Sequence, residues 1–237
     1  MSGEGKKGTT VAKIPKWEAE LWSYVSSGDG MSCPLRKYRP VREKGTWCPD
    51  EYRGRLNRLL DEKRFNFNSY DFIDSEAGGV CRLCQLVERL AEAYLKAGDA
   101  LGPPVSTELV RLFDPQNPLE IHQLPLKAYH GAIWSQQDGW VIQVKDSDTA
   151  PTMRFTVFHE AFHILAHCRT TPVFRKRGSV VGSFNELLVD HFAFCTLMPR
   201  EWIVEKWAEV KDLGRMAEIF VVPKSAMCIR LRQLGLL

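Results

Sequence analysis

The sequence predicts an α+β protein that is mostly helical and carries a small β-sheet or hairpin. Apolar residues recur at helical spacing in residues 84–95 and again in residues 155–165. Two β-rich runs, residues 129–135 and 140–144, flank the turn signal Asp138-Gly139, which is typical of a hairpin. Helical patterns before and after one hairpin favour a helical core with a small sheet.

Composition places the chain among ordinary globular proteins with one main core. It has 237 residues, of which 44% are hydrophobic and 26% charged. The net charge of +3 does not by itself predict nucleic-acid binding. No apolar run reaches membrane-spanning length, and the first residues lack the apolar core of a signal peptide. The seven cysteines are irregularly spaced, which favours reduced thiols, and we expect a cytoplasmic protein without membrane association.

The chain divides into four segments. Residues 1–16 are rich in Gly, Lys and Thr and read as a flexible tail. Residues 17–77 form an N-terminal extension without an assigned role, in which residues 53–63 predict a capped helix. Residues 78–200 form the main unit, and residues 201–237 form a helical tail.

Capping and helix-breaking residues set the elements of the main unit. The helix over residues 84–95 should end at Gly98 or Gly102, before Pro103-Pro104. Ser106 should cap a short helix that runs through Phe113. After the hairpin, one helix begins near Thr152, and a second runs over about residues 184–197. One or two more helices are expected before the C-terminus.

The first of these two helices carries the sequence His159-Glu160-Ala161-Phe162-His163. Two histidines four residues apart point to one side of a helix, so their rings can share one metal ion. Glu160 leaves the same turn and can reach a water molecule on that metal. This H-E-x-x-H spacing is typical of zinc peptidases, with Glu160 as the catalytic base.

Glu186 and Asp190 complete the predicted site. A catalytic zinc needs three protein ligands and one open position. Glu186 lies on the next helix, which can pack antiparallel to the motif helix and bring this carboxylate to His159 and His163. Asp190, one turn further, is placed to accept a hydrogen bond from a metal-bound imidazole. The alternative is that both carboxylates belong to a solvated helix face.

The other histidines and the cysteines fit this site less well. His167 continues the series, but it lies roughly 12 Å along the helix from His159, so we interpret it as a packing or supporting residue. His191 is interpreted as mostly structural. A second, structural zinc would need the residues Cys33, Cys48, Cys81 and Cys84. Only one C-x-x-C pair is present, and Cys84 lies on an apolar helix face where cysteine is often core.

Residues 154–167, R-F-T-V-F-H-E-A-F-H-I-L-A-H, resemble the motif of the ImmA/IrrE-type metallopeptidases. Residues 186–199 are similar to the family's second motif, with Leu188 in place of its second glutamate. Residues 220–236 resemble the family's helix-turn-helix-like tail, with Val221, Val222 and Pro223 where the family often has Gly and Val-Ser. The resemblance covers about residues 78–237.

This resemblance implies a zincin-like metallopeptidase core over residues 78–200 and a helix-turn-helix-like tail over residues 201–237. It implies a cytoplasmic zinc endopeptidase that cleaves a helix-turn-helix transcription repressor and relieves repression of a mobile element, prophage or stress regulon. Tyr129, His130 and His191 are candidate donors to the oxyanion.

Two alternatives remain. One is a non-catalytic metal-containing module that binds a repressor without cutting it. The other is a DNA-binding regulator that uses the tail together with the basic run Arg175-Lys176-Arg177. The lost turn glycine makes nucleic-acid binding a poor candidate for the main role. The sequence does not define the oligomeric state.

Overall fold

The computed structural model of the chain describes residues 15–27, 73–74, 79–80, 82–127, 130–136, 139–169 and 180–237. Within these ranges some side chains lie outside the description, among them those of residues 167–169 and 180–187. Residues 1–14 of the predicted tail and the predicted helix over residues 53–63 also lie outside it. The described part is mostly helical with a small sheet, so the predicted α+β class is confirmed.

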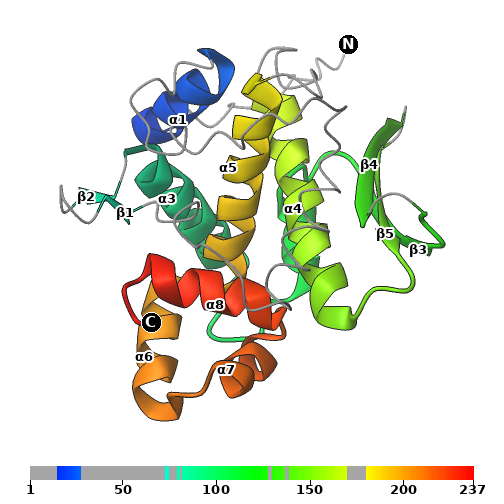
Figure 1. Cartoon of the computed structure of the whole chain (residues 1–237). Coiled ribbons are helices and arrows are strands. Elements are labelled where there is room, and N and C mark those ends of the chain that lie inside the picture. The colour runs from blue at the N-terminus through cyan, green and yellow to red at the C-terminus, as the bar shows by residue number, and fades with distance from the viewer. Residues whose placement is uncertain are drawn as a thin grey trace, which may run out of the picture.

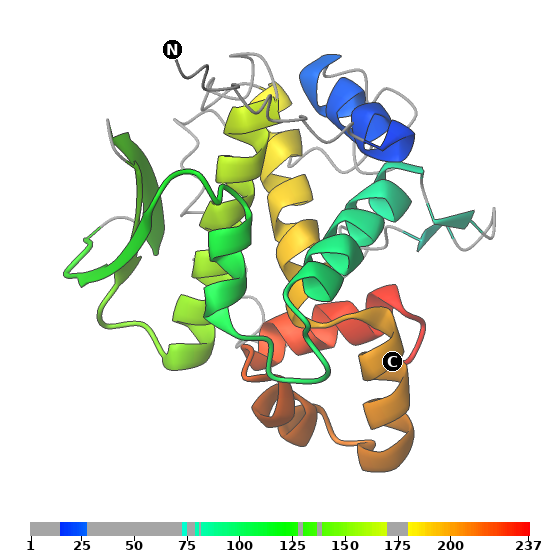
Figure 2. The ribbon, with the colours of Figure 1, turned by 180° about the vertical axis from the view of Figure 1, so that it is seen from behind.

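Two long helices form the centre of the molecule. Helices α4 (Ala150–Arg169) and α5 (Val180–Leu197) lie side by side and run in opposite directions (Figures 1 and 2). Helix α3 (Arg82–Ala97) packs against α5, and α1 (Lys16–Ser27) packs against α3. The apolar residues of all four helices belong to one buried cluster.

Helix α1 lies almost entirely in the predicted N-terminal extension, residues 17–77, yet it packs into this core. Leu21, Trp22 and Val25 are buried there. The ring centroids of Trp22 and Phe162 of α4 lie 5.9 Å apart. Residues well before position 78 therefore help to hold the helix that carries the H-E-x-x-H motif.

A three-stranded sheet lies on one side of α4, opposite α5 (Figure 1). Strand β5 (Gly139–Lys145) is central, pairs in parallel with β3 (Leu119–Leu124) and pairs antiparallel with β4 (Gly131–Gln136). Alternate residues of β5 join the core on the α4 side, as the period of two in a strand requires. These residues are Trp140, Ile142 and Val144.

The antiparallel pairing of β4 with β5 confirms the predicted hairpin. Strand β3 was not predicted, and its burial pattern gives the reason. Residues 120–123 are all exposed, because β3 lies at a sheet edge, so the alternation that signals a strand is missing. A two-residue antiparallel pair, β1 (Ile73–Asp74) with β2 (Gly79–Val80), precedes α3.

Local capping agrees with the sequence for the elements before the sheet. Helix α3 ends at Ala97, directly before Gly98. The hydroxyl of Ser106 accepts a hydrogen bond from the backbone N–H of Glu108 at 3.2 Å, which caps η4 (Thr107–Leu112), a 3₁₀ helix. None of the helices in the described part of the chain has the length and apolar character needed to cross a membrane.

Three helices finish the chain, where the sequence predicted one or two. They are α6 (Arg200–Val210), α7 (Leu213–Phe220) and α8 (Lys224–Gln233). Helix α6 ends at Val210 and is followed by Lys211, which has a left-handed φ of 50°. The Asp212 side chain caps α7 by accepting from the Arg215 N–H at 2.6 Å. No glycine marks this break, so the sequence pattern did not reveal it.

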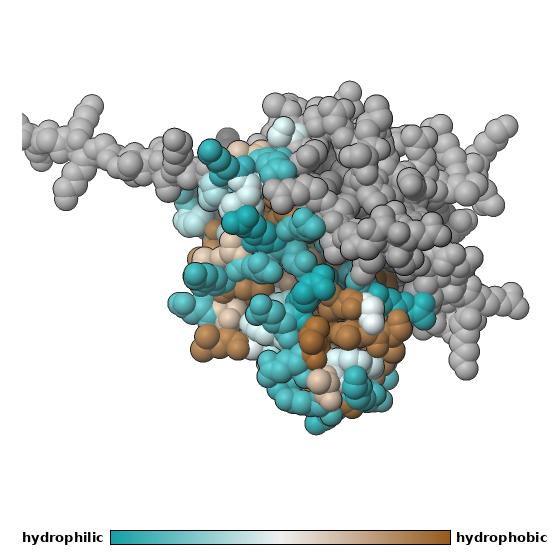
Figure 3. Space-filling model, turned by 90° about the vertical axis from the view of Figure 1, so that its left-hand side faces the viewer, coloured by the Kyte–Doolittle hydropathy of each residue, from teal (hydrophilic) through white to brown (hydrophobic). Residues whose placement is uncertain are grey.

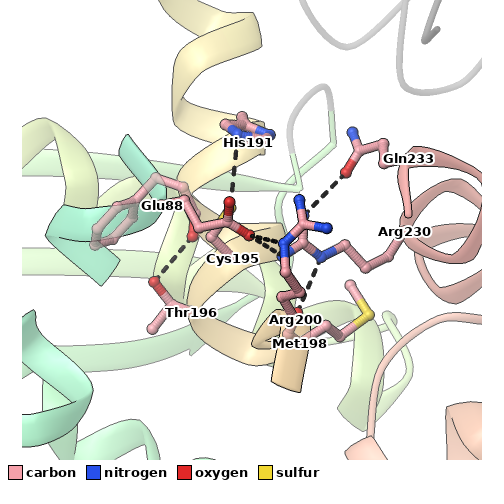
Figure 4. A network of polar contacts seen from close by, with 9 residues as sticks. Glu88, His191, Cys195, Thr196, Met198, Arg200, Arg230 and Gln233 are labelled. Carbon is pink, nitrogen blue, oxygen red and sulfur yellow. Dashed lines mark hydrogen bonds and ion pairs between the residues drawn. The ribbon is translucent and has the colours of Figure 1, made fainter. Parts of the chain in front are cut away.

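Two arginines fasten these helices to the core. Arg154 of α4 donates to the carbonyl of Val221, in the turn between α7 and α8, and to that of Val105. Arg230 of α8 is 1% exposed, and its Nη2 lies 2.8 Å from an oxygen of Glu88 on α3 (Figure 4). The C-terminal helices are therefore an integral part of the fold.

Figure 3 shows one face of the molecule, on which hydrophilic residues surround apolar patches in the lower half. Large apolar side chains exposed by the described residues are scattered over several elements. They are Leu101, Ile121, Trp134, Val204 and Leu237. Single exposed apolar side chains are ordinary on folded proteins, so their exposure alone does not indicate a binding surface.

Candidate active site

The motif helix α4 is enclosed on most sides. Its residues Val157, Phe158, Ala161, Phe162, Ile164, Leu165 and Ala166 are all buried, because α5 packs on one side and the sheet on the other. His159 and Glu160 are buried with them, at 5% and 6% exposure, while His163 is half-buried. Burying three polar side chains in such surroundings is costly unless each has a partner or a function.

The two histidines of the motif lie next to each other, one helical turn apart. Their ring centroids are separated by 5.6 Å, and the ring planes meet at 67°. This is the neighbour relation expected for positions i and i+4 of a helix. The structure therefore brings both predicted histidine ligands to one point on the surface of α4.

Asp190 of α5 holds the first of these histidines. Its Oδ1 lies 2.7 Å from Nδ1 of His159, and the two side chains are 17% and 7% exposed. Since a carboxylate only accepts, Nδ1 is the donor, and Nε2 of the neutral ring keeps its lone pair. The antiparallel packing of α4 and α5 thus fixes both the tautomer and the orientation of His159.

The third predicted ligand, Glu186, lies on α5 one turn before Asp190. Its side chain, like that of His167, is outside the described residues. Among the side chains that the structure does describe, no three His, Cys, Asp or Glu residues gather closely enough to hold a metal ion. The role of Glu186 therefore stays a prediction, supported by its position on the helix that delivers Asp190.

The first residue of strand β4, Gly131, packs against Glu160 of α4. A Cβ atom built on Gly131 would lie 3.1 Å from Oε1 and 3.2 Å from Cγ of Glu160, and 2.3 Å from Cγ2 of Thr156. A side chain at position 131 would displace these atoms, so only glycine allows the strand to approach α4 this closely. Gly131 was not predicted as a site residue; a glycine inside the predicted strand over residues 129–135 was the available signal.

The structure describes two of the three candidate oxyanion donors, His130 and His191, and they lie in different places. Tyr129 lies outside the described residues. The ring of His130 lies 2.6 Å from a carboxylate oxygen of Asp148, a contact that ties the start of β4 to the loop after β5. His191 is buried, and it lies beside Glu88 and Cys195 on the side of α5 that faces α3 and α8 (Figure 4). His130 is thus next to Gly131 and the motif, whereas His191 belongs to a different network.

That network also contains a cysteine beside a histidine, a pair that could act as nucleophile and base only if the thiol ionised. The Sγ of Cys195 lies 3.6 Å from Nε2 of His191. Burial raises the pKa of the Cys195 thiol to about 12, so the group stays protonated at neutral pH. The Cys195–His191 pair therefore does not form a competing active site.

The predicted cysteine site lies largely beyond the structure. Cys33, Cys48 and Cys81 are outside the described residues. Cys84 is 1% exposed and belongs to the hydrophobic core. Its location matches the alternative that this cysteine serves packing.

Comparison with known families agrees with the motifs. Residues 117–232 match the family model of the M78 peptidases, described as the IrrE N-terminal-like domain. The match includes the whole sheet and helices α4 to α7, with nearly all of α8. A search of curated protein sequences finds no match to this chain. Residues 117–232 thus form an IrrE N-terminal-like peptidase domain, which agrees with the resemblance of the motifs to the ImmA/IrrE-type peptidases.

Proposed function

We propose that this protein is a zinc-dependent endopeptidase that cleaves a helix-turn-helix transcription repressor in the cytoplasm. Cleavage would relieve repression of a mobile element, a prophage or a stress regulon. The family supplies the peptidase class. The observation that carries the proposal is the hydrogen bond between His159 and Asp190, because a buried imidazole oriented by a carboxylate is typical of a metal ligand.

The residues present suit zinc. His159 presents Nε2 with Nδ1 already engaged, His163 is its immediate neighbour, and Glu186 would add the third ligand. Two imidazoles and one carboxylate are a donor set of catalytic zinc sites, which keep a further position open. A zinc ion bound there supplies Lewis acidity, which lowers the pKa of a water molecule and polarises the scissile carbonyl.

Glu160 is the proposed general base. The residue is 6% exposed and lies on the same helical turn as His159, so its carboxylate would meet the proposed site with little bulk water around it. It would accept a proton from the attacking water and later pass this proton to the leaving amine. His130 and Tyr129 remain the candidates that donate a hydrogen bond to the oxyanion.

The sheet offers a binding edge for an extended substrate. In the described part of the chain β4 pairs only with β5, so its other edge is open for a further strand. This edge starts at Gly131, whose Cα lies against Glu160. A peptide that adds to β4 would therefore pass the catalytic base. A linker between two domains of a repressor has the extended backbone that this mode of binding needs.

The burial of the last helix supports a structural role for the tail. Residues Ala226, Met227, Ile229, Arg230, Leu231 and Gln233 of α8 are buried. A helix that reads the major groove must present several side chains to base edges, and the exposed residues of α8 are Lys224 and Arg232. This favours a peptidase over a DNA-binding regulator.

Turnover of a repressor tests the proposal. The zinc-loaded protein is incubated with a tenfold excess of the helix-turn-helix repressor encoded beside its gene, and fragments are identified by mass spectrometry. The proposal predicts more than one repressor cleaved per enzyme molecule, and no cleavage after zinc is removed with a chelator. Stoichiometric binding without fragments would instead support the non-catalytic module.

A further inference from the structure

Strand β4 presents two different faces along its open edge. Gly131 and Ile133 point toward α4, because a Cβ at 131 would meet Thr156 and because Ile133 packs on the core. Since side chains alternate along a strand, Ala132 and Trp134 point to the opposite, outer face of the sheet. A substrate strand on this edge would alternate in the same way, so some of its side chains would lie on the outer face.

Trp134 is the large apolar side chain on that outer face, and it is 55% exposed. Its indole N–H donates to Oε1 of Gln143 on β5 at 3.1 Å, which restrains the ring on the sheet. Val141, its cross-strand neighbour on β5, is 8% exposed. Ala132 is small and partly exposed, so Trp134 and Ala132 form a shallow apolar surface beside the open edge, next to the buried Val141.

The distance from the base fixes which substrate position would meet Trp134. Three residues of strand separate it from Gly131, which corresponds to about 10 Å. If the scissile bond lies at the level of Gly131 and the substrate runs antiparallel to β4, the residue at the level of Trp134 is about three positions toward the substrate N-terminus. Residues opposite each other on paired strands share a face, so that side chain would contact the indole.

We propose that Trp134 is a specificity-determining residue that selects a large apolar or aromatic side chain about three residues before the cleaved bond. This inference rests on the proposed peptidase activity. Aromatic contacts of this kind correspond to a preference of about three- to tenfold over a small polar side chain. Trp134 acts through substrate binding, so the preference should appear in KM more than in kcat.

The test uses a mixed peptide library and the zinc-loaded full chain. Cleavage sites are mapped by mass spectrometry for the wild type, Trp134→Ala, Trp134→Phe and Leu101→Ala, the last being a control at a side chain that is 95% exposed on another element. The wild type and Leu101→Ala should enrich Phe, Leu and Trp at the stated position. Trp134→Ala should lose this enrichment and raise KM for a matched peptide about three- to tenfold, whereas Trp134→Phe should retain most of it.

A flat wild-type profile at that position, or an unchanged profile in Trp134→Ala, overturns the role of Trp134 while the peptidase stands. Absence of any cleavage by the wild type overturns the proposed activity and this inference with it. A second arm does not need turnover. Phage-displayed peptides selected on Glu160→Gln should be enriched for aromatic residues, and the same selection on Glu160→Gln with Trp134→Ala should not.

Discussion

Replacing Gly131 by alanine probes the contact between the edge strand and the catalytic base. The new Cβ would lie 2.3 Å from Cγ2 of Thr156, although carbon atoms pack best at about 3.5–4.0 Å. Thr156 is 1% exposed and stiff at χ1, so it has little room to turn away. Overpacking of this kind costs about 1–3 kcal/mol of unfolding free energy. For a chain of this size that predicts a fall in Tm of about 2–12 °C.

The same substitution should impair catalysis, because the new Cβ also lies 3.1 Å from Oε1 of Glu160. Displacing a catalytic group by about 1 Å can cost on the order of a hundredfold in rate. Because a contact of 3.1 Å is relieved by a shift of a few tenths of an ångström, we expect a loss of kcat in peptide hydrolysis that is smaller than this, at unchanged zinc content. Thermal unfolding and kcat are measured on the same zinc-loaded preparation.

A second substitution separates the two effects. Thr156→Ser removes the Cγ2 methyl group, so Gly131→Ala/Thr156→Ser should regain most of the lost stability. Its kcat should stay below that of Thr156→Ser alone, because the contact with Glu160 persists. If Gly131→Ala melts within a degree of the wild type and keeps its activity, β4 does not lie against Glu160 and the reasoning fails.

Two further predictions concern partly buried carboxylates. Asp190→Asn should weaken zinc binding about 10- to 100-fold in competition with a chromophoric chelator, while the exposed control Glu205→Gln should not; equal affinities would show that Asp190 does not orient the ligand. Burial favours a higher pKa for Glu88, but the charges of Arg230 and Arg200 and the hydrogen bond from Arg230 outweigh it and lower the pKa below its ordinary 4.5. The ionised pair then stabilises the fold fully above about pH 4.5 and less as the pH falls below it. Urea unfolding of Glu88→Gln should show a loss of about 3–5 kcal/mol that is constant from pH 7 down to about pH 4.5 and shrinks only as the pH falls further, through the lowered pKa of Glu88; a loss that stays constant throughout this acid range would contradict this.

The sequence predicted the relative positions of site residues best where these depend on residue spacing along a helix. His159 and His163 had to be neighbours because they are four apart on a helix, and the structure places their rings together. The contact of Asp190 with His159 joins residues 31 positions apart. It was predictable because two long helices joined by a loop pack antiparallel. The first contact lies within one helix, and the second follows from the antiparallel packing of two neighbouring helices.

Other features depend on contacts that leave no local pattern. Strand β3 is exposed at four consecutive residues, so its sequence does not alternate between apolar and polar residues. It pairs in parallel with β5, which is not the next strand along the chain, so no hairpin pattern predicts it either. The break at Lys211 uses a left-handed residue that is not glycine. The approach of Gly131 to Glu160 is visible only once the sheet has been placed against α4. From the sequence, Arg230 looks like a surface residue of a basic helix. Its burial depends on the contact with Glu88 of α3, which is 142 positions away in the sequence.

The central claim is that Glu160 is the base of a site that holds one zinc ion with His159, His163 and Glu186. The most direct measurement is zinc content together with repressor cleavage for the wild type, Glu160→Gln and Glu186→Ala. The account predicts one zinc equivalent and cleavage for the wild type, one equivalent and at least about a hundredfold slower cleavage for Glu160→Gln, and loss of zinc for Glu186→Ala. Cleavage by Glu160→Gln at the wild-type rate, or full zinc retention by Glu186→Ala, would contradict it.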